Sequence, residues 1–179
     1  MLVPIYRGDG GHWRVVLVRR AARGVHAGEI AFPGGKPEPG DCDLAATAVR
    51  EAAEETGLAP SRVRMLSALP VVETRSSRFA IHPFLAHIEP PSTWLPDTHE
   101  IAAVLSVAAR ELRTPAAQAR RRVPGGAARE FASTPCFRLR GVTIWGATFR
   151  ILAPLVPLLA RPGLRWLCVD GIAPGMKKP

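Results

Sequence analysis

Lysine is scarce in this sequence, and its scarcity argues against one class of function. Only Lys36, Lys177 and Lys178 occur among the 179 residues, so arginine supplies most of the 24 basic residues and the net charge of +9. Tails that bind nucleic acid usually cluster lysine with arginine, and we therefore expect no nucleic-acid partner. The arginine content has two interpretations: a compositional bias, or an affinity for a polyanion such as a nucleotide or a phosphate ester.

Cysteine is also rare, and its placement excludes two kinds of small scaffold. Cys42, Cys136 and Cys168 are odd in number and far apart, so they cannot form a disulfide framework. None of them has the Cys-x-x-Cys spacing of a zinc site. The first ten residues contain no apolar run that resembles a signal peptide. We therefore expect a cytoplasmic protein.

A stretch near the C-terminus is apolar over the length of a membrane span. Residues 141–160 contain Arg150 near the middle, and Pro154 and Pro157 in the second half. A charge at the bilayer centre costs at least ~2.5 kcal/mol, so we expect no membrane association. The segment instead predicts an apolar helix over about 142–160, either buried on a sheet or forming a homodimer interface.

The length and composition fit a single α/β domain over residues 1–179. Apolar residues make up 47% of the chain, which excludes wholesale disorder. Local patterns predict strands at 13–18, 63–72 and 79–88, helices at 44–56 and 100–112, and an irregular segment at 114–135. A sheet covered by helices is the architecture that this mixture favours.

Acidic residues gather in one short segment of the basic chain. Six of the 15 acidic residues fall within 18 positions: Glu38, Asp41, Asp43, Glu51, Glu54 and Glu55. The last three stand at i, i+3 and i+4, so they share one face of the predicted helix, where like charges repel. A hard divalent cation such as Mg²⁺ relieves that repulsion. The alternative is a solvated acidic helix face.

The residues around this helix support its boundaries and a role in metal binding. Asp41 or Asp43 can cap its N-terminus, and Gly57 can end it. Arg50 can pair with a neighbouring carboxylate and orient it. The backbone at Gly35 has no side chain in the way, so its carbonyl oxygen can approach the same cation.

These residues form a pattern that resembles the Nudix box. Residues 35–58, GKPEPGDCDLAATAVREAAEETGL, are similar to G-x5-E-x7-R-E-U-x-E-E-x-G-U. Asp41 stands at the first Glu position, and one extra residue separates it from Arg50. Both features resemble the coenzyme A diphosphatase group. The segments FPGGK at 32–36 and IWGAT at 144–148 are similar to that group as well.

The resemblance implies a fold, a reaction and a cofactor. It implies an α/β/α sandwich with a mixed central sheet, in which the box forms a loop–helix–loop. It implies hydrolysis of a diphosphate linked to another moiety, with Mg²⁺ or Mn²⁺. The implied metal ligands are Glu51 and Glu55, with the Gly35 carbonyl.

Further roles are less narrowly defined. Glu54 is either a third metal ligand or the general base, and Glu100, in the loop segment before residue 101, is the other candidate base. Arg50 is included in the catalytic set. The candidate substrate-binding residues are His26, Lys36, Arg19 and Arg121. Each also has an ordinary alternative: Glu100 can start a helix, His26 can bond the backbone, and Arg121 can be solvated.

Three functions are compatible with these features. The first is hydrolysis of coenzyme A or its derivatives to 3′,5′-ADP and 4′-phosphopantetheine. The second is Nudix hydrolysis of ADP-ribose, NADH or a nucleoside triphosphate. The third is a catalytically inactive module that binds a nucleotide or RNA. The three intact box carboxylates at 51, 54 and 55 argue against the third, because a binding module need not retain mutually repelling acids.

Overall fold

The computed structural model describes residues 1–23, 26–74, 79–124 and 131–161. Its strands are β1 (Leu2–Arg7), β2 (Trp13–Arg20), β3 (Ile30–Ala31), β4 (Val63–Ala68), β5 (Val72–Glu73), β6 (Ala80–Ile81), β7 (Phe84–Ile88), β8 (Ile101–Ala108), β9 (Gln118–Pro124), β10 (Phe131–Leu139) and β11 (Val142–Ile144). The α-helices are α1 (Leu44–Thr56), α2 (Ala109–Leu112), α3 (Gly146–Leu152) and α4 (Val156–Leu159). Single 3-10 turns lie at Asp9–Gly11 and Pro60–Arg62.

A mixed six-stranded sheet forms the centre of the fold. Its order is β3-β2-β1-β7-β4, and β8 pairs with β2 as well. The β1–β7 pair is parallel, whereas the other pairs of this sheet are antiparallel. Two smaller sheets, β11-β10-β9 and β5-β6, lie beside it. The predicted mixed sheet is confirmed.

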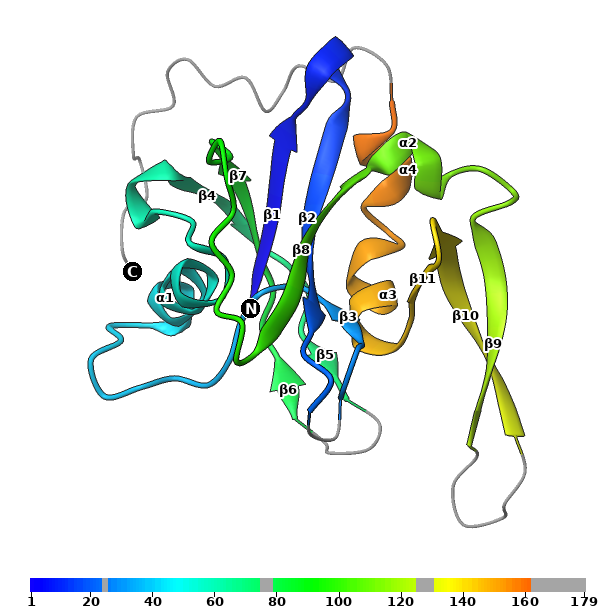
Figure 1. The fold of residues 1–179 in the computed structure, drawn as a ribbon, viewed down its shortest axis with the longest axis horizontal. Coiled ribbons are helices and arrows are strands. Elements are labelled where there is room, and N and C mark those ends of the chain that lie inside the picture. Colours follow the sequence, from blue (N-terminus) through cyan, green and yellow to red (C-terminus); the bar gives the residue numbers. More distant parts are fainter. Residues whose placement is uncertain (24–25, 75–78, 125–130, 162–179) are drawn as a thin grey trace, which may run out of the picture.

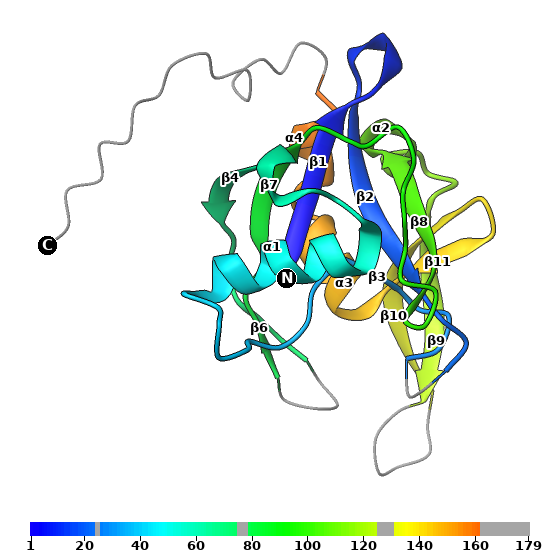
Figure 2. The ribbon, with the colours of Figure 1, turned by 60° about the vertical axis from the view of Figure 1, so that its left-hand side comes forward.

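Helices cover both faces of the central sheet (Figures 1 and 2). Residues alternate along β2: Val16 packs in the cluster beneath α1, whereas Val15 and Leu17 pack in the cluster that contains α3 and α4. Ala48 and Ala52 of α1 are fully buried, so small side chains let this helix lie close to the sheet. The predicted α/β/α layering is thereby confirmed, with α1 as the only described helix on one face.

The helix that carries the acidic residues has the predicted bounds. Of the two candidate caps, Asp43 is the one used, because its carboxylate accepts a hydrogen bond of 2.7 Å from the Ala46 N–H. Gly57 ends the helix in the left-handed region, with φ at 73°, and its N–H donates to the Ala53 carbonyl. The predicted strand at 13–18 lies within β2.

The predicted helix at 100–112 is wrong over most of its length. Residues 101–108 form β8, which pairs with β2 from Arg14 to Arg20, and only Ala109–Leu112 are helical. The alanines of this segment favour a helix locally. Pairing along β2 overrides that preference, because it buries Ile101 completely and Val107 almost completely.

Two further predictions need correction. Within the segment at 114–135, residues 118–124 and 131–135 are not irregular, since they belong to the antiparallel pair β9 and β10. Pro135 is accommodated there because β11 pairs only with the end of β10, so much of the hairpin has no second partner strand. The apolar segment at 142–160 is not one helix but β11, α3 and α4.

The buried position of the C-terminal segment is confirmed. Ile151, Leu152, Leu155, Val156 and Leu159 are all buried, and they pack in the cluster on the face opposite α1. Within the described residues, no helix is long and apolar enough to span a bilayer. The single-domain organisation over 1–179 stays a prediction.

Substitution of Gly57 tests how the fold ends α1. We expect Gly57→Ala to lower the free energy of unfolding by at least about 1 kcal/mol, because a left-handed conformation costs a residue with a side chain roughly 1–2 kcal/mol. The new methyl group would also lie 2.8 Å from the Cβ of Leu95. The matched control is Gly40→Ala, where a Cβ meets nothing within 4 Å. Urea denaturation measures both, and equal stability of the two variants would contradict this account.

Candidate active site

The carboxylates of α1 divide between the sheet side and the solvent side of the helix. Glu55 is buried, at 4% exposure, and the Glu51 side chain is 16% exposed, whereas the Glu54 side chain is 58% exposed. Glu51 and Glu55 are one turn apart, so they project in nearly the same direction. The helix therefore presents two covered carboxylates and one solvated carboxylate.

The glycine loop before α1 fits closely around the two covered carboxylates. The Gly34 N–H donates a 2.9 Å hydrogen bond to Oε2 of Glu55. At Gly35, a Cβ atom would overlap the carboxylate of Glu51, so no residue with a side chain fits there without displacing it. The Gly35 backbone therefore contacts the carboxylate with which it is predicted to share a cation.

Arg50 ties the loop to the helix. Its Nε and Nη2 donate to the two oxygens of Asp41 at 3.0 and 3.1 Å, and Nη2 also donates to the Lys36 carbonyl. Its Nη1 donates to Glu54 at 2.9 Å, and Nη2 lies 3.3 Å from Glu51. The hydrogen bond from Arg50 holds the pKa of Asp41 well below its usual range. Asp41 thus supports the loop before α1.

Burial makes the two inner carboxylates unusually weak acids. Desolvation raises the pKa of Glu55 from 4.5 to about 7, although the hydrogen bond from Gly34 acts in the opposite direction. Desolvation also raises the pKa of Glu51. The negative charge of Glu100 reinforces both pKa shifts, that of Glu51 adds to the shift of Glu55, and that of Glu54 adds to the shift of Glu51. Such a site favours a bound cation, because the cation offsets both the burial and the mutual repulsion.

Glu100 lies in the expected place, although a strand follows it instead of a helix. It is exposed in the loop before β8, and its carbonyl accepts a 2.7 Å hydrogen bond from the Ala21 N–H at the end of β2. Its charge acts on both Glu51 and Glu55. The loop candidate for the general base is therefore held on the same side of the sheet as the box carboxylates.

The donor set suits a hard divalent cation. Carboxylate and carbonyl oxygens are what Mg²⁺ and Mn²⁺ prefer, and Glu51, Glu55 and Gly35 supply them. Within the described ranges, no three acidic, histidine or cysteine side chains converge as a ready-made cage. Glu54 instead bonds Arg50. The fit is thus to two carboxylates, a backbone carbonyl and water ligands.

The predicted substrate-binding residues do not form one group. His26 pairs with Glu29 at 3.1 Å on an exposed turn. The ammonium group of Lys36 lies 5.7 Å from the ring centre of Phe79. Arg19 follows the strand alternation toward the face opposite α1. Their roles in substrate binding stay predictions.

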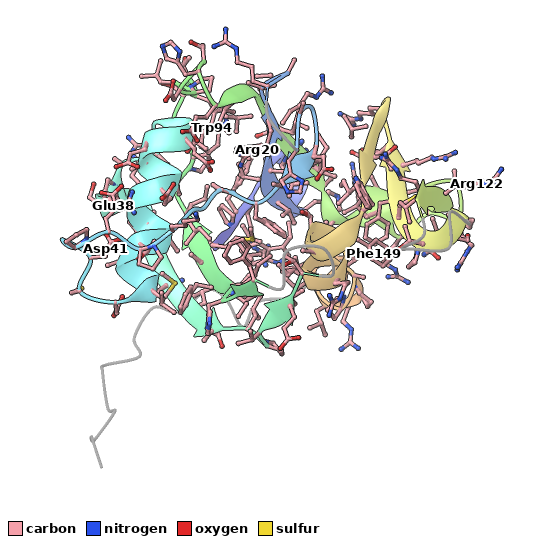
Figure 3. All side chains as sticks on the ribbon, turned by 90° about the horizontal axis from the view of Figure 1, so that it is seen from below. Arg20, Glu38, Asp41, Trp94, Arg122 and Phe149 are labelled. Carbon is pink, nitrogen blue, oxygen red and sulfur yellow. The ribbon has the colours of Figure 1, made fainter. Side chains whose placement is uncertain are left out.

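Arg121 is separated from the carboxylates of α1. Its guanidinium lies over the ring of Trp145, 4.5 Å from the ring centre, beyond the central sheet. The adjacent Arg122 lies at the far side of the molecule from Glu38 and Asp41 (Figure 3). The structure therefore does not bring Arg121 together with the box.

Arg20 is a site residue that the sequence analysis missed. It follows Val16 and Val18 in the β2 alternation, and its charge acts on Glu55. The side chain is half-buried, and no hydrogen bond or ion pair of it occurs within the described residues. The alternation of β2, read from the buried Val16, could have distinguished Arg20 from Arg19.

Titration of Glu55 can be followed through stability. A raised acid pKa stabilises the folded chain fully below about pH 4.5, and this contribution is lost as the pH rises through about 7. In a chelator, we expect the wild type to lose on the order of 3 kcal/mol across this window relative to Glu55→Gln. The glutamine keeps an acceptor for the Gly34 N–H. Urea midpoints measured across the window test this, and parallel pH profiles would contradict it.

Comparison with known proteins finds that relatives of this chain are Nudix hydrolases. The chain is 44% identical over 70 residues to Nudix hydrolase 15, mitochondrial, of Arabidopsis thaliana, a match that covers 38% of this chain and 25% of that protein. It is 36% identical over 108 residues to the uncharacterized Nudix hydrolase NudL of Salmonella newport, covering 60% and 55%. The chain thus spans between a quarter and about half of the length of these relatives.

A solved structure supports the fold. The Nudix hydrolase RenU of M. smegmatis superposes with a TM-score of 0.52 and 22% identity, over 63% of this chain and 70% of that one. The family model for the NUDIX domain matches residues 1–124, which include every strand and helix that borders the carboxylates. This chain belongs to the Nudix family.

Proposed function

We propose that the chain hydrolyses the diphosphate bond of a nucleoside diphosphate linked to another moiety, with Mg²⁺ or Mn²⁺ as cofactor. The observation that carries the proposal is the pair of covered carboxylates, Glu51 and Glu55, packed against the Gly34–Gly35 loop in a Nudix box. Two weak acids buried side by side are costly for a fold that does not use them. A bound divalent cation would offset this cost, because it would neutralise the two carboxylates.

The residues divide the work of the reaction. Glu51, Glu55 and the Gly35 carbonyl hold the cation, which when bound neutralises the diphosphate oxygens and lowers the pKa of a water. Arg50 fixes the loop relative to α1 through Asp41, and so keeps the Gly35 carbonyl in place. Each of these roles needs the rigid loop–helix junction that the hydrogen bonds provide.

Glu100 is the better of the two candidate bases. The carboxylate of Glu54 already accepts a hydrogen bond from Arg50 at 2.9 Å. The Glu100 side chain makes no hydrogen bond or ion pair within the described part of the chain, and it is exposed to water. We propose that Glu100 takes the proton from the attacking water.

Arg20 is suited to bind the substrate. Its guanidinium is half-buried on the face of the sheet that α1 covers, and its charge acts on Glu55 of that helix. A planar guanidinium can donate two hydrogen bonds to one phosphate. We propose that Arg20 contacts the diphosphate, whereas His26 and Lys36 in the neighbouring loops contact the moiety attached to it.

The preferred substrate is coenzyme A or a derivative of it, cut to 3′,5′-ADP and 4′-phosphopantetheine. The extra residue in the box and the FPGGK and IWGAT segments support this specificity. The alternatives of ADP-ribose, NADH or a nucleoside triphosphate are favoured by the segment that follows Leu17. In this segment the coenzyme A group has Ser, Leu and Arg, and this chain has Arg20, Arg23 and Gly24 at the same positions. The C-terminal segment is buried in the described chain, so a homodimer interface there is not needed to cover it.

A panel of substrates tests the proposal. Coenzyme A, its 3′-dephospho form, ADP-ribose, NADH and 8-oxo-dGTP are incubated with Mg²⁺ or Mn²⁺, and products are identified by mass. Fastest release of 4′-phosphopantetheine would support the coenzyme A specificity. Faster hydrolysis of another compound would replace that specificity and keep the chemistry. No metal-dependent turnover of any compound would support the inactive binding module.

Removal of a metal ligand should abolish turnover without unfolding the chain. We expect Glu51→Gln and Glu55→Gln each to lower kcat/KM by at least ~100-fold, since metal ligation stabilises the transition state by several kcal/mol. Glu89→Gln, an exposed acid outside the box, is the matched control. Full activity of either box variant, with wild-type circular dichroism, would remove the ligand assignment.

Arg20 and Glu100 should affect different kinetic parameters. We expect Arg20→Gln to raise KM about tenfold or more, because it removes a phosphate contact, and Glu100→Gln to lower kcat by ~100-fold or more. If Glu54→Gln lowers kcat by ~100-fold and Glu100→Gln does not, the base is Glu54.

A further inference from the structure

The positive charge of the chain lies almost entirely outside the part that forms the candidate active site. Residues 112–179 contain 12 of the 24 Lys and Arg residues, but only two of the 15 Asp and Glu residues, Glu130 and Asp170. Residues 1–111 contain the other 12 basic residues and 13 acidic ones. The catalytic part is thus nearly neutral, and the excess charge requires an explanation of its own.

Four of these 12 basic residues lie on strands β9 and β10, a hairpin that extends away from the central sheet (Figure 1). Its strands pair from Gln118 to Pro124 with Phe131 to Phe137. Because β11 pairs only with Phe137–Leu139, the outer part is a two-stranded ribbon, and β9 is an edge strand within the described residues. We call β9 and β10, with Arg120, Arg121, Arg122 and Arg138, the basic ribbon.

The ribbon holds the guanidinium groups of Arg120 and Arg121 in place without neutralising them. Arg120 donates from Nε to the Ser133 hydroxyl at 2.7 Å, and from Nη2 to the Ser133 carbonyl at 2.8 Å. The guanidinium of Arg121 lies over the ring of Trp145, 4.5 Å from the ring centre. Within the described part of the chain, neither arginine has an ion pair with a carboxylate. Their positive charge therefore remains available to an external anion.

Protection of an edge strand does not account for this arrangement. Charged side chains on an edge discourage pairing with other strands, but a mobile lysine serves that purpose equally well. A guanidinium held in a fixed plane loses less freedom when it binds a phosphate with two hydrogen bonds. Arg120 and Arg122 stand two residues apart, about 6.8 Å along the strand.

The position of the ribbon excludes it from the hydrolytic site. Arg122 lies at one end of the molecule, whereas Glu38 and Asp41 lie beside α1 at the other (Figure 3). The exposed side chains of the ribbon are mostly polar: Gln118, Arg120, Arg122, Ser133, Pro135 and Arg138. Apolar side chains that insert match a lipid surface, and Pro135 is the only apolar residue among these six exposed side chains.

We propose that the basic ribbon binds the phosphodiester backbone of a nucleic acid, independently of base sequence and at a distance from the hydrolytic site. The expectation of no nucleic-acid partner was based on the scarcity of lysine. The ribbon supplies the charge through arginine on a folded hairpin instead of through a lysine-rich tail.

Two matched arginine pairs test the proposal. Arg120→Gln/Arg122→Gln removes two charges from the ribbon, and Arg62→Gln/Arg64→Gln removes two charges with the same spacing beside and on the edge strand β4. Binding of fluorescent single-stranded RNA, single-stranded DNA and duplex DNA is measured by anisotropy over a range of salt concentrations. The three probes show which nucleic acid supplies the phosphate backbone.

We expect the wild type to bind with a Kd on the order of 1–100 µM at physiological salt, as sequence-independent binding usually does. The ribbon pair should weaken binding about tenfold or more, and should reduce the slope of log K against log salt by roughly 1.4–1.8. The β4 pair should stay within about twofold of the wild type, because charges beyond a Debye length of ~10 Å are screened.

Three outcomes would overturn the proposal: no binding by the wild type at low salt, equal weakening by both pairs, or binding to phosphatidylserine vesicles but to no oligonucleotide. Amide hydrogen exchange of the wild type provides a second measurement that needs no substitution. Oligonucleotide should slow exchange in β9 and β10 and leave β4 unchanged. Protection elsewhere, with none in the ribbon, would also overturn the proposal.

Discussion

The contact between the glycine loop and the two covered carboxylates is the constraint around which the site is built. The Gly34 N–H bonds Glu55, and the bare backbone of Gly35 leaves room for Glu51. Burial raises the pKa of both acids, so their ionised forms lower the stability of the fold. A divalent cation offsets that loss of stability, because it replaces the lost hydration of the carboxylates.

The rest of the catalytic part holds this contact in register. Arg50 joins α1 to the preceding loop through Asp41, and Asp43 and Gly57 fix the two ends of the helix. The fully buried Ala48 and Ala52 set α1 close to the sheet. The hydrogen bond from the Ala21 N–H to the Glu100 carbonyl then holds the loop before β8 against the end of β2. Elements distant in sequence thereby place Arg20 and Glu100 near the box.

The sequence was most informative where the pattern is local. Helix α1, its cap and its terminal glycine follow from residues within one segment, and so does the spacing of the acids. Strand β8 was missed because alanine-rich residues favour a helix until β2 offers a partner. Arg20 was missed because its relevance depends on which face of the sheet receives α1. The hairpin was missed because its prolines and glycines signal irregular structure, and only pairing between β9 and β10 overrides them.

Metal binding without turnover tests the central claim most directly. Mn²⁺ is titrated into the wild type by calorimetry near pH 6, in two buffers of different ionisation enthalpy. Because Glu55 has a pKa of about 7, we predict that Mn²⁺ binding releases close to one proton and that Glu55→Gln loses both the release and most of the affinity. Unchanged Mn²⁺ binding in Glu55→Gln would contradict the assignment of this carboxylate as a metal ligand.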